Sequence, residues 1–310
     1  MNNILKREVS FYPRISGKPE TKELLELLTT DRFKDKVEFV REQKRVCKDA
    51  YRQAKLNLPA FTVSGVFADG RAQSLMKHSG LIAVDIDKEA NADVGDFAEL
   101  KERIKNVPYV AYCGRSVGGE GFFCIIPIKA PERHKEHFAS LKTAFARCGI
   151  SIDGSCGDVS RKRFVSFDDK PYINPSAETY TRVIMPTDRG GRGMRHDDED
   201  TEALRKEVEA VAEEAERLGT DLFERQKDDP NTYDNWFKIG CSLASALGEG
   251  GRELFHRLSA VGSSYNFGQC DRKFDDCLKT RHEVGIGTFF KLCKERGLGA
   301  AVDFKDIPNI

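Results

Sequence analysis

The pattern of hydrophobic and polar positions divides the chain into a mixed first part and a helical second part. In the first part, short apolar runs predict strands, and longer amphipathic segments predict helices between them. From Leu81 onwards the order is strand, helix, two strands, helix and strand, which is typical of an α+β domain built on an RRM-like sheet. The expected strands are Ala60–Phe67, Leu81–Asp85, Tyr109–Cys113, Phe122–Ile128, Arg163–Phe167 and Tyr180–Ile184, and the expected helices are Glu20–Leu28, Asp35–Lys55, Asp96–Asn106 and Glu132–Cys148.

In the second part, apolar residues recur at helical spacing. The first such stretch carries its apolar residues three or four positions apart from Leu204 to Leu218, and Gly219 follows where helices commonly end. This pattern predicts an all-α domain. Its further helices are expected at Trp236–Leu247, Gly251–Leu258, Cys270–Lys279 and Thr288–Arg296.

The segment from Pro186 to Asp200 is rich in glycine and charge and has no apolar period, as expected of a linker. We therefore divide the chain into an α+β domain at residues 1–185, a linker at 186–200 and a helical domain at 201–310.

Composition narrows the class of protein. The 50 basic and 50 acidic residues balance, but residues 1–185 carry 31 basic against 25 acidic residues, so the first domain is slightly basic. No apolar run approaches the roughly 18–20 residues of a membrane span, and no secretory signal opens the chain. Nine cysteines without C-x-x-C spacing indicate reduced thiols. We expect a cytoplasmic protein with no membrane partner.

A pair of acidic residues ends one predicted strand. In "GLIAVDIDKEA", Asp85 and Asp87 flank Ile86, and alternate side chains of a strand share a face. Two carboxylates held this close repel each other unless a positive charge lies between them. One or two divalent cations would supply that charge, since Mg²⁺ prefers carboxylate oxygens and phosphates. A strand that runs into a polar turn is the simpler alternative.

A glycine-rich hairpin follows about 30 residues later, in "YCGRSVGGEGFFCIIPI". Glycines allow the backbone to approach an anion, Ser116 can donate a hydrogen bond, and Arg115 can pair with phosphate. A hairpin without a ligand would have the same pattern.

A third charged stretch, "SIDGSCGDVSRKRFVSFDDKPYINP", carries Asp153 and Asp158 ahead of Arg161 and Arg163. Either acid could complete a metal site with Asp85 and Asp87. The two arginines, which share a face of an extended segment, could neutralise a triphosphate. A solvated charged loop is the alternative.

A histidine pair and a basic segment could each bind a ligand or simply form part of the protein surface. His134 and His137 lie three apart on a predicted helix, but their surroundings match no compact zinc motif, so we expect a solvated helix face. The segment from Arg32 to Lys55 holds 9 basic and 4 acidic residues. It could face nucleic acid or form an ordinary amphipathic surface helix.

Together the three charged motifs resemble those of the archaeo-eukaryotic primase (primase–polymerase) superfamily. The resemblance extends over residues 5–185 and is closest to a mobile-element branch once called the VirE N-terminal domain. It rests on the order and wording of four segments, "LPAFTVSGVF", "HSGLIAVDID", "YCGRSVGGEGF" and "DVSRKRFVSFD".

This resemblance implies that Asp85, Asp87 and Asp153 bind Mg²⁺ or Mn²⁺ and carry nucleotidyl transfer. It further implies contacts to nucleotide or nucleic acid from Arg115, Ser116, Asp158, Arg161 and Arg163. One departure concerns the hairpin, where related primases place a histidine that contacts the incoming phosphates. Phe122 and Phe123 stand there instead. Arg115 is one possible replacement for the missing donor.

The second domain resembles the helical primase C-terminal (PriCT) module. Its pattern of W-x-x-h-G, an aromatic–basic–Leu–Ser run, a later aromatic and G-h-G-T-h-h is matched by Trp236, Gly240, Phe255, Ser259, Phe274 and Thr288.

The leading hypothesis is a primase or primase-polymerase of a mobile element, acting on single-stranded DNA with nucleoside triphosphates. A separate replicative helicase is expected, because the chain has no G-x-x-x-x-G-K-[ST] motif. The alternatives are a catalytically degenerate nucleic-acid-binding replication factor, and a nuclease or another nucleotidyltransferase using the same acids.

Overall fold

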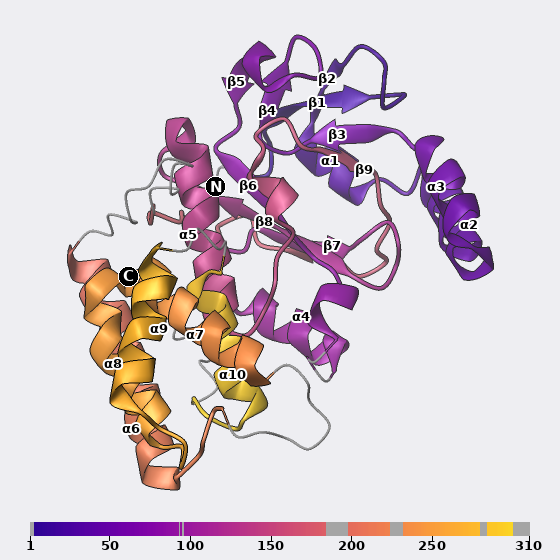
Figure 1. Ribbon diagram of the computed structural model, residues 1–310. Helices are drawn as coiled ribbons and strands as arrows, with labels where there is room; N and C mark the ends of the chain where they lie inside the picture. Colours follow the sequence, from indigo (N-terminus) through magenta and orange to yellow (C-terminus); the bar gives the residue numbers. More distant parts are fainter. Residues whose placement is uncertain are drawn as a thin grey trace. The chain divides into compact units, whose positions relative to one another are not determined.

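The computed structural model describes residues 3–92, 94, 96–183, 198–223, 232–279 and 284–299 (Figure 1). The chain forms two compact units. The first contains Met1–Ala139 and Ser151–Val183, and the second contains Ser140–Ile150 and Ile184–Pro308. Most of the predicted linker at 186–200 falls outside the described residues.

Two four-stranded sheets and a small hairpin form the framework of the first unit. One sheet has the order β2-β1-β3-β9, and the other has the order β10-β7-β8-β6. The strands of the first sheet are β1 (Glu8–Tyr12), β2 (Glu20–Glu23), β3 (Ala60–Thr62) and β9 (Lys162–Phe164). Those of the second are β6 (Leu81–Ile86), β7 (Tyr112–Arg115), β8 (Phe122–Pro127) and β10 (Tyr172–Ile173), and the hairpin pairs β4 (Gly65–Phe67) with β5 (Leu75–His78).

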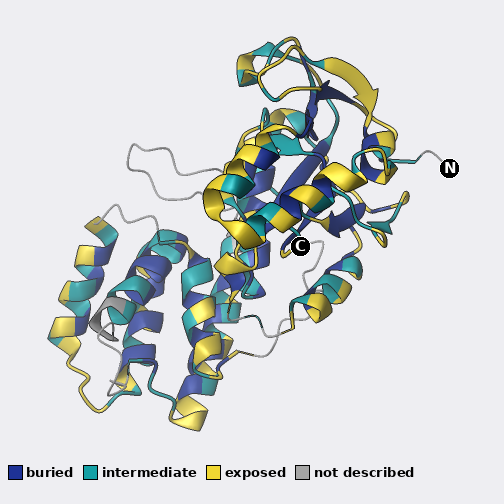
Figure 2. Cartoon of the chain, turned by 90° about the vertical axis from the view of Figure 1, so that its right-hand side faces the viewer, coloured by how far each residue is buried: buried dark blue, intermediate teal, exposed yellow. Residues whose placement is uncertain are grey.

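The second sheet has a split β-α-β arrangement, whereas the predicted strand Arg163–Phe167 pairs as β9 in the first sheet. Strand β8 lies between β6 and β7 and runs antiparallel to both, and α4 (Phe97–Lys105) connects β6 to β7. Alternation along β6 sends Leu81, Ala83 and Asp85 to one face. The first two join an apolar core that also includes residues of the first sheet, so Asp85 lies at the end of a buried face. In Figure 2 the central strands are dark blue, in keeping with this burial.

The N-terminal region differs from the predicted pattern in two places. The predicted helix Glu20–Leu28 begins only at Leu24, because Glu20–Glu23 pairs with β1, a strand that the pattern did not predict. The predicted helix Asp35–Lys55 is divided at Cys47, whose backbone is extended and whose Sγ accepts a hydrogen bond from Ala50 N. The resulting helices are α1 (Leu24–Thr29), α2 (Lys34–Val46) and α3 (Lys48–Leu56).

Three predicted strands have other limits in the structure. Ala60–Phe67 is divided into β3 and β4 by a turn in which Thr62 Oγ1 donates to Gly65 O. Strand β7 starts at Tyr112 and extends through Gly114 to Arg115. The predicted strand at Tyr180 is an isolated bridge to Ile128, and Ile184 lies outside the described residues.

The expectation of a solvated face for His134 and His137 is wrong. Both side chains of α5 (His134–Arg147) are buried, with exposures of 5% and 0%. His137 Nε2 accepts a hydrogen bond from Ala130 N, and His134 Nδ1 lies 3.1 Å from His78 Nε2. The imidazoles thus satisfy internal polar groups, which the spacing along the helix could not indicate.

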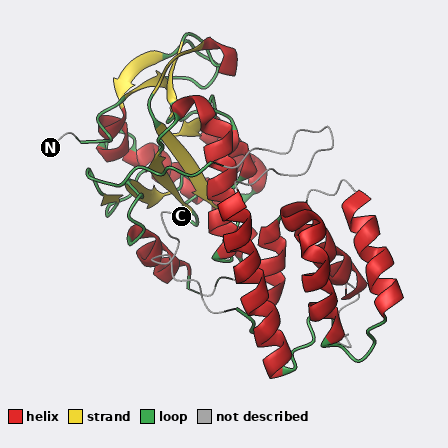
Figure 3. Ribbon diagram, turned by 90° about the vertical axis from the view of Figure 1, so that its left-hand side faces the viewer, coloured by secondary structure: helices red, strands yellow, loops and turns green. Residues whose placement is uncertain are grey.

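The described part of the second unit consists of helices joined by loops (Figure 3). Its core brings the PriCT-pattern residues together. Trp236 stacks on Phe255 with 5.6 Å between ring centroids and donates from Nε1 to Ser259 Oγ, and Phe274 lies 5.6 Å from Phe255. The helices are α6 (Asp198–Leu218), α7 (Thr232–Leu247), α8 (Arg252–Ala260), α9 (Phe267–Lys279) and α10 (Ile286–Glu295). None of the helices in the described ranges combines the length and hydrophobicity that a membrane crossing requires.

The packing of α7 depends on the absence of a side chain at Gly240. A Cβ there would lie 2.8 Å from Cys277 Sγ and 3.2 Å from Phe255 Cζ. We expect Gly240→Ala to destabilise the second unit by about 1–3 kcal/mol, because overpacking outweighs the roughly 1 kcal/mol gained in helix propensity.

Gly268→Ala on α9 is the matched control, since a Cβ there meets nothing closer than 3.8 Å. It should be neutral or stabilising by up to about 1 kcal/mol. Thermal unfolding followed by circular dichroism compares the two variants, and equal melting temperatures would contradict this account of the packing.

Candidate active site

The site is built around the end of β6, where Asp85 pairs in register with Phe123 of β8. Asp85 is the last residue of β6 on its face of the sheet, and Asp87 follows just beyond the strand in an exposed position. The apolar run that forms β6 is therefore what holds Asp85 at the edge of the core.

Asp85 forms an ion pair with Arg163 of β9. Arg163 Nη2 lies 2.5 Å from Asp85 Oδ1, and the side chains are 9% and 21% exposed, respectively. The guanidinium carbon of Arg163 lies 3.9 Å from the Phe123 ring centroid, so the cation also packs on an aromatic face. Arg163 Nε and Nη1 are buried and have no hydrogen-bond partner among the described residues. Two donor atoms of this guanidinium are thus unsatisfied within the part of the chain that the structure describes.

The pair is held in its charged form. Burial alone would raise the pKa of Asp85, but attraction by Arg163 outweighs it, and the pKa lies below its ordinary value. Burial opposes the charge of Arg163 as well, yet Asp85 raises the pKa of that guanidinium. Asp87 differs. Although the residue as a whole is exposed, partial burial of its carboxylate and the charges of Asp85 and Asp153 raise its pKa.

Asp153 lies beside Asp85 through a backbone contact, in which Asp153 N donates to Asp85 O at 2.9 Å. Buried Asn91 fixes this arrangement. Its Nδ2 donates to Asp87 O and Ser151 O, and its Oδ1 accepts from Ser151 N. One side chain thus connects the loop after β6 with the segment that carries Asp153.

Three side chains here form a group that could hold a metal ion, namely Asp85, Asp153 and Cys156, whose ligand atoms lie within 4.8 Å of one another. Cys156 was not among the predicted ligands, and burial near Asp85 raises the pKa of its thiol to about 12. A protonated thiol is a poor ligand for Mg²⁺ or Mn²⁺, whereas carboxylates suit both ions. Asp87 is not part of this group, although the charges of Asp85 and Asp153 act on it. Among the three side chains, the two carboxylates are the ligands that suit a hard divalent cation.

The glycine-rich segment closes a tight loop between β7 and β8. Ser116 N donates to Gly121 O, and Gly119 N donates to Ser116 O, with Gly119 at a positive φ of 83°. A Cβ at Gly121 would lie 2.7 Å from Ile86 O and 3.3 Å from Asp87 Oδ1. The hairpin can therefore approach the acidic residues only because position 121 has no side chain.

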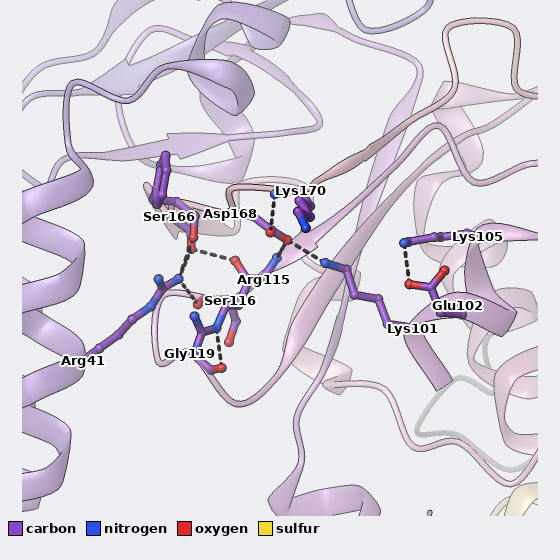
Figure 4. Close-up of polar contacts among 11 residues, drawn as sticks. Arg41, Lys101, Glu102, Lys105, Arg115, Ser116, Gly119, Ser166, Asp168 and Lys170 are labelled. Atoms are coloured by element: carbon purple, nitrogen blue, oxygen red, sulfur yellow. Dashed lines mark hydrogen bonds and ion pairs between the residues drawn. The ribbon is translucent and has the colours of Figure 1, made fainter. Parts of the chain in front are cut away.

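A network behind the hairpin fixes its position (Figure 4). Arg41 of α2 is buried and donates from Nη2 to Ser116 O and Phe167 O. Asp168, whose side chain is 6% exposed, accepts from Arg115 N and pairs with Lys101 Nζ at 2.7 Å. Neither Arg41 nor Asp168 was predicted as a site residue, although Asp168 stands in the third quoted motif.

The remaining predicted residues occupy different surroundings. Arg115 donates from Nε to Gly119 O within the hairpin. Arg161 Nη2 lies 3.5 Å from Asp153 Oδ2 on the exposed side. The carboxylate of Asp158 accepts from both Ser160 N and Ser160 Oγ, as in a local turn. Geometry therefore brings Asp153, and not Asp158, to Asp85.

Phe122 and Phe123, which replace the expected histidine, are both buried at 3% exposure. Phe123 faces Asp85 and supports Arg163, as described above. Phe122 points to the other face of the sheet and contacts Phe97 of α4, with 5.0 Å between ring centroids. The two aromatic side chains therefore pack within the unit.

The Asp168 network generates a stability prediction. Burial opposes the charge of Asp168, but hydrogen bonds from Lys101 and the backbone lower its pKa below the ordinary 3.8. Folding thus favours the ionised form of Asp168. This form stabilises the fold fully at pH values above the pKa of Asp168 in the unfolded chain, and the stabilisation is lost as the pH falls through the pKa in the folded protein. We expect Asp168→Asn to cost about 2–4 kcal/mol at pH 7.

Urea denaturation of wild type and Asp168→Asn between pH 7 and pH 3 measures this difference, which should shrink below pH 3.8. Asp169→Asn changes the neighbouring exposed acid and should have little effect. A difference that is independent of pH would contradict the assigned role of the charge.

Comparisons with known proteins match two separate segments of the chain. Residues 53–173, which contain β6, the hairpin and β9, match the family model described as BT4734-like, N-terminal domain. Residues 220–293 match the family model described as Primase C terminal 2 (PriCT-2). No curated protein and no solved structure matches the chain significantly. Two separate segments of the chain thus match family models, in the order in which the sequence resembled a primase–polymerase domain and a primase C-terminal module.

Proposed function

We propose that the protein is a metal-dependent nucleotidyltransferase that synthesises primers on single-stranded DNA during replication of a mobile genetic element. The observation that carries this proposal is the convergence of Asp85, Asp153 and Arg163 at one end of β6. Carboxylates for a cation and a buried guanidinium with two unpartnered donor atoms form a pattern suited to a nucleoside triphosphate. The pairing with a PriCT-2 domain supports a role in priming.

Each site residue has a role that its surroundings support. Asp85, Asp87 and Asp153 would hold Mg²⁺ or Mn²⁺, which when bound would activate a 3′-oxygen and stabilise charge on the triphosphate. Arg161 and Arg163 bind phosphate oxygens. Ser116, at the start of the hairpin, donates a hydrogen bond to the same group, and the Arg41 network keeps the hairpin in place.

Arg115 and Asp158 lie farther from this centre in the proposal. Arg115 uses Nε inside the hairpin, which leaves its terminal nitrogens for phosphate. Asp158 shapes the turn before Arg161, and thereby the path of nucleic acid along it. A separate helicase would provide the single-stranded template.

A second candidate function is a nucleic-acid-binding replication factor without catalysis. The observation that favours it is Arg163, which already neutralises Asp85 in the place where a cation is required. The buried Phe122 and Phe123 in place of a histidine favour it too. Such a protein would retain DNA binding and lack nucleotide incorporation.

Primer synthesis on single-stranded DNA distinguishes the two functions. With Mn²⁺ or Mg²⁺ and labelled nucleotides, we expect wild type to form product. The rate of product formation by Asp87→Asn should be lower by a factor of about 100 or more, because a metal-binding carboxylate is removed. Asp87 is the informative position because it is exposed and forms no ion pair with a described residue, so the fold should tolerate the change.

Glu89→Gln removes an exposed acid two residues away and is the matched control, expected to keep full activity. Asp85→Ala is less suitable, because it leaves Arg163 buried and unpaired. Product that persists in Asp87→Asn would exclude the proposed site, and DNA binding without product in wild type would favour the second function.

A further inference from the structure

Lys55 lies next to the site although it belongs to none of its three motifs. It stands in the last turn of α3, and its Nζ lies 5.5 Å from the Tyr51 ring centroid and 5.2 Å from the Phe164 ring centroid. Phe164 directly follows Arg163 in β9. The helix that begins at Cys47 therefore carries a lysine to the strand that supplies the buried arginine.

Tyr51 connects the same helix to the hairpin. A Cβ at Gly118 would lie 3.0 Å from the Tyr51 hydroxyl and 3.6 Å from Lys44 Nζ, and Lys44 pairs with Glu120 at 2.6 Å. One side of α2 and α3 thus borders the hairpin and β9 together. Lys55 follows Tyr51 by one helical turn, and its charge interacts with those of Asp85 and Asp87.

The charges around Lys55 are those of the site. Its strongest electrostatic interactions are attraction by Asp85 and repulsion by Arg161, followed by those with Asp87 and Arg163. Lys55 is half-buried, and it forms no ion pair with any described residue. Burial lowers its pKa below the ordinary 10.5, so the ammonium lacks a full partner for its charge.

The balance of charge indicates what that partner is. Asp85, Asp87 and Asp153 carry three negative charges, and Lys55, Arg161 and Arg163 carry three positive charges, so the cluster is neutral by itself. A divalent cation on the carboxylates would leave an excess of two positive charges. A polyphosphate is the anion that neutralises such an excess.

We propose that Lys55 is a phosphate-binding residue of the site and contacts the triphosphate of the nucleotide. This inference rests on the proposed function for the identity of the ligand. Arg115 is the competing donor, because its Nε donates to Gly119 O and its terminal nitrogens stay available, although Arg115 and buried Arg41 repel each other. Lys55 Nζ lies against the Tyr51 and Phe164 rings and forms no hydrogen bond or ion pair with a described residue.

Equilibrium binding of dATP and of inorganic tripolyphosphate in the presence of Mn²⁺ tests the proposal. We expect Lys55→Ala to weaken both ligands by about tenfold or more, as expected for loss of a charge-assisted phosphate contact. Lys55→Arg should recover part of the affinity because it keeps the charge. Lys48→Ala, which removes an exposed lysine from the same helix, is the matched control and should leave both affinities unchanged.

A role as a simple counter-ion for the acids gives a different result. Lys55→Ala would then bind Mn²⁺ more tightly, measured by electron paramagnetic resonance without nucleotide, and its affinity for dATP would equal that of Lys48→Ala. That outcome overturns the proposal, as does the absence of any tripolyphosphate binding by wild type. A greater loss of dATP affinity in Arg115→Ala than in Lys55→Ala would instead assign the role to Arg115.

Primer synthesis by the same preparations separates this inference from the proposed function. If wild type forms product but the affinity for dATP does not depend on Lys55, the result supports primer synthesis and contradicts a role of Lys55 in phosphate binding. If binding of dATP and tripolyphosphate depends on Lys55 but no product forms, the result contradicts nucleotidyl transfer and supports Lys55 as a phosphate-binding residue.

Discussion

The ion pair between Asp85 and Arg163 is the interaction on which the site depends. It connects β6 of one sheet with β9 of the other, in a position where both side chains are mostly withdrawn from water. Removing two charges from water costs several kcal/mol per ion, and only close contact and further packing offset that cost. The 2.5 Å contact and the Phe123 ring beneath the guanidinium provide both. The two sheets therefore have to be docked correctly before either charge is tolerated.

The same pair gives a partial answer to the question raised by Asp85 and Asp87 in the sequence. Strand alternation predicts that the two carboxylates share a face and need a positive charge, but it cannot say which charge. The structure puts an arginine from a distant motif on Asp85 and leaves Asp87, whose pKa is raised, beside Asp153. Arg163 thus neutralises Asp85. A further cation would mainly neutralise the exposed Asp87.

Much of the fold could be predicted because the apolar residues of most elements recur at the regular spacing of a strand or a helix. Strand β6, α4, β8, and the helices of the second unit follow runs that read clearly on their own. Two of the features that were missed carry no apolar period of their own. Glu20–Glu23 is polar throughout and becomes a strand only by pairing with β1, and α2 and α3 are separated at Cys47, which no glycine or proline marks.

For the site, the order of the motifs predicted which segments matter but not which side chains in them meet. Asp153 and Asp158 were equivalent in sequence, and a backbone hydrogen bond to Asp85 distinguishes them. Arg41 and Asn91 are buried and form hydrogen bonds to segments 60 or more residues away in sequence. Asp168 accepts a hydrogen bond from Arg115 N, 53 residues away. Such roles have no signature in local spacing.

The bare backbone of the hairpin has a consequence for how this sequence can diverge. At Gly119 the left-handed backbone excludes most side chains, and at Gly121 any Cβ would collide with the carbonyl of Ile86. Glu120 is exposed and under neither restriction, whereas Val117 packs against the apolar core. We therefore expect descendants of this gene to drift at position 120 while 119 and 121 stay fixed, whether or not the chain retains its chemistry. The backbone conformation fixes position 119, and the close approach of Ile86 O fixes position 121.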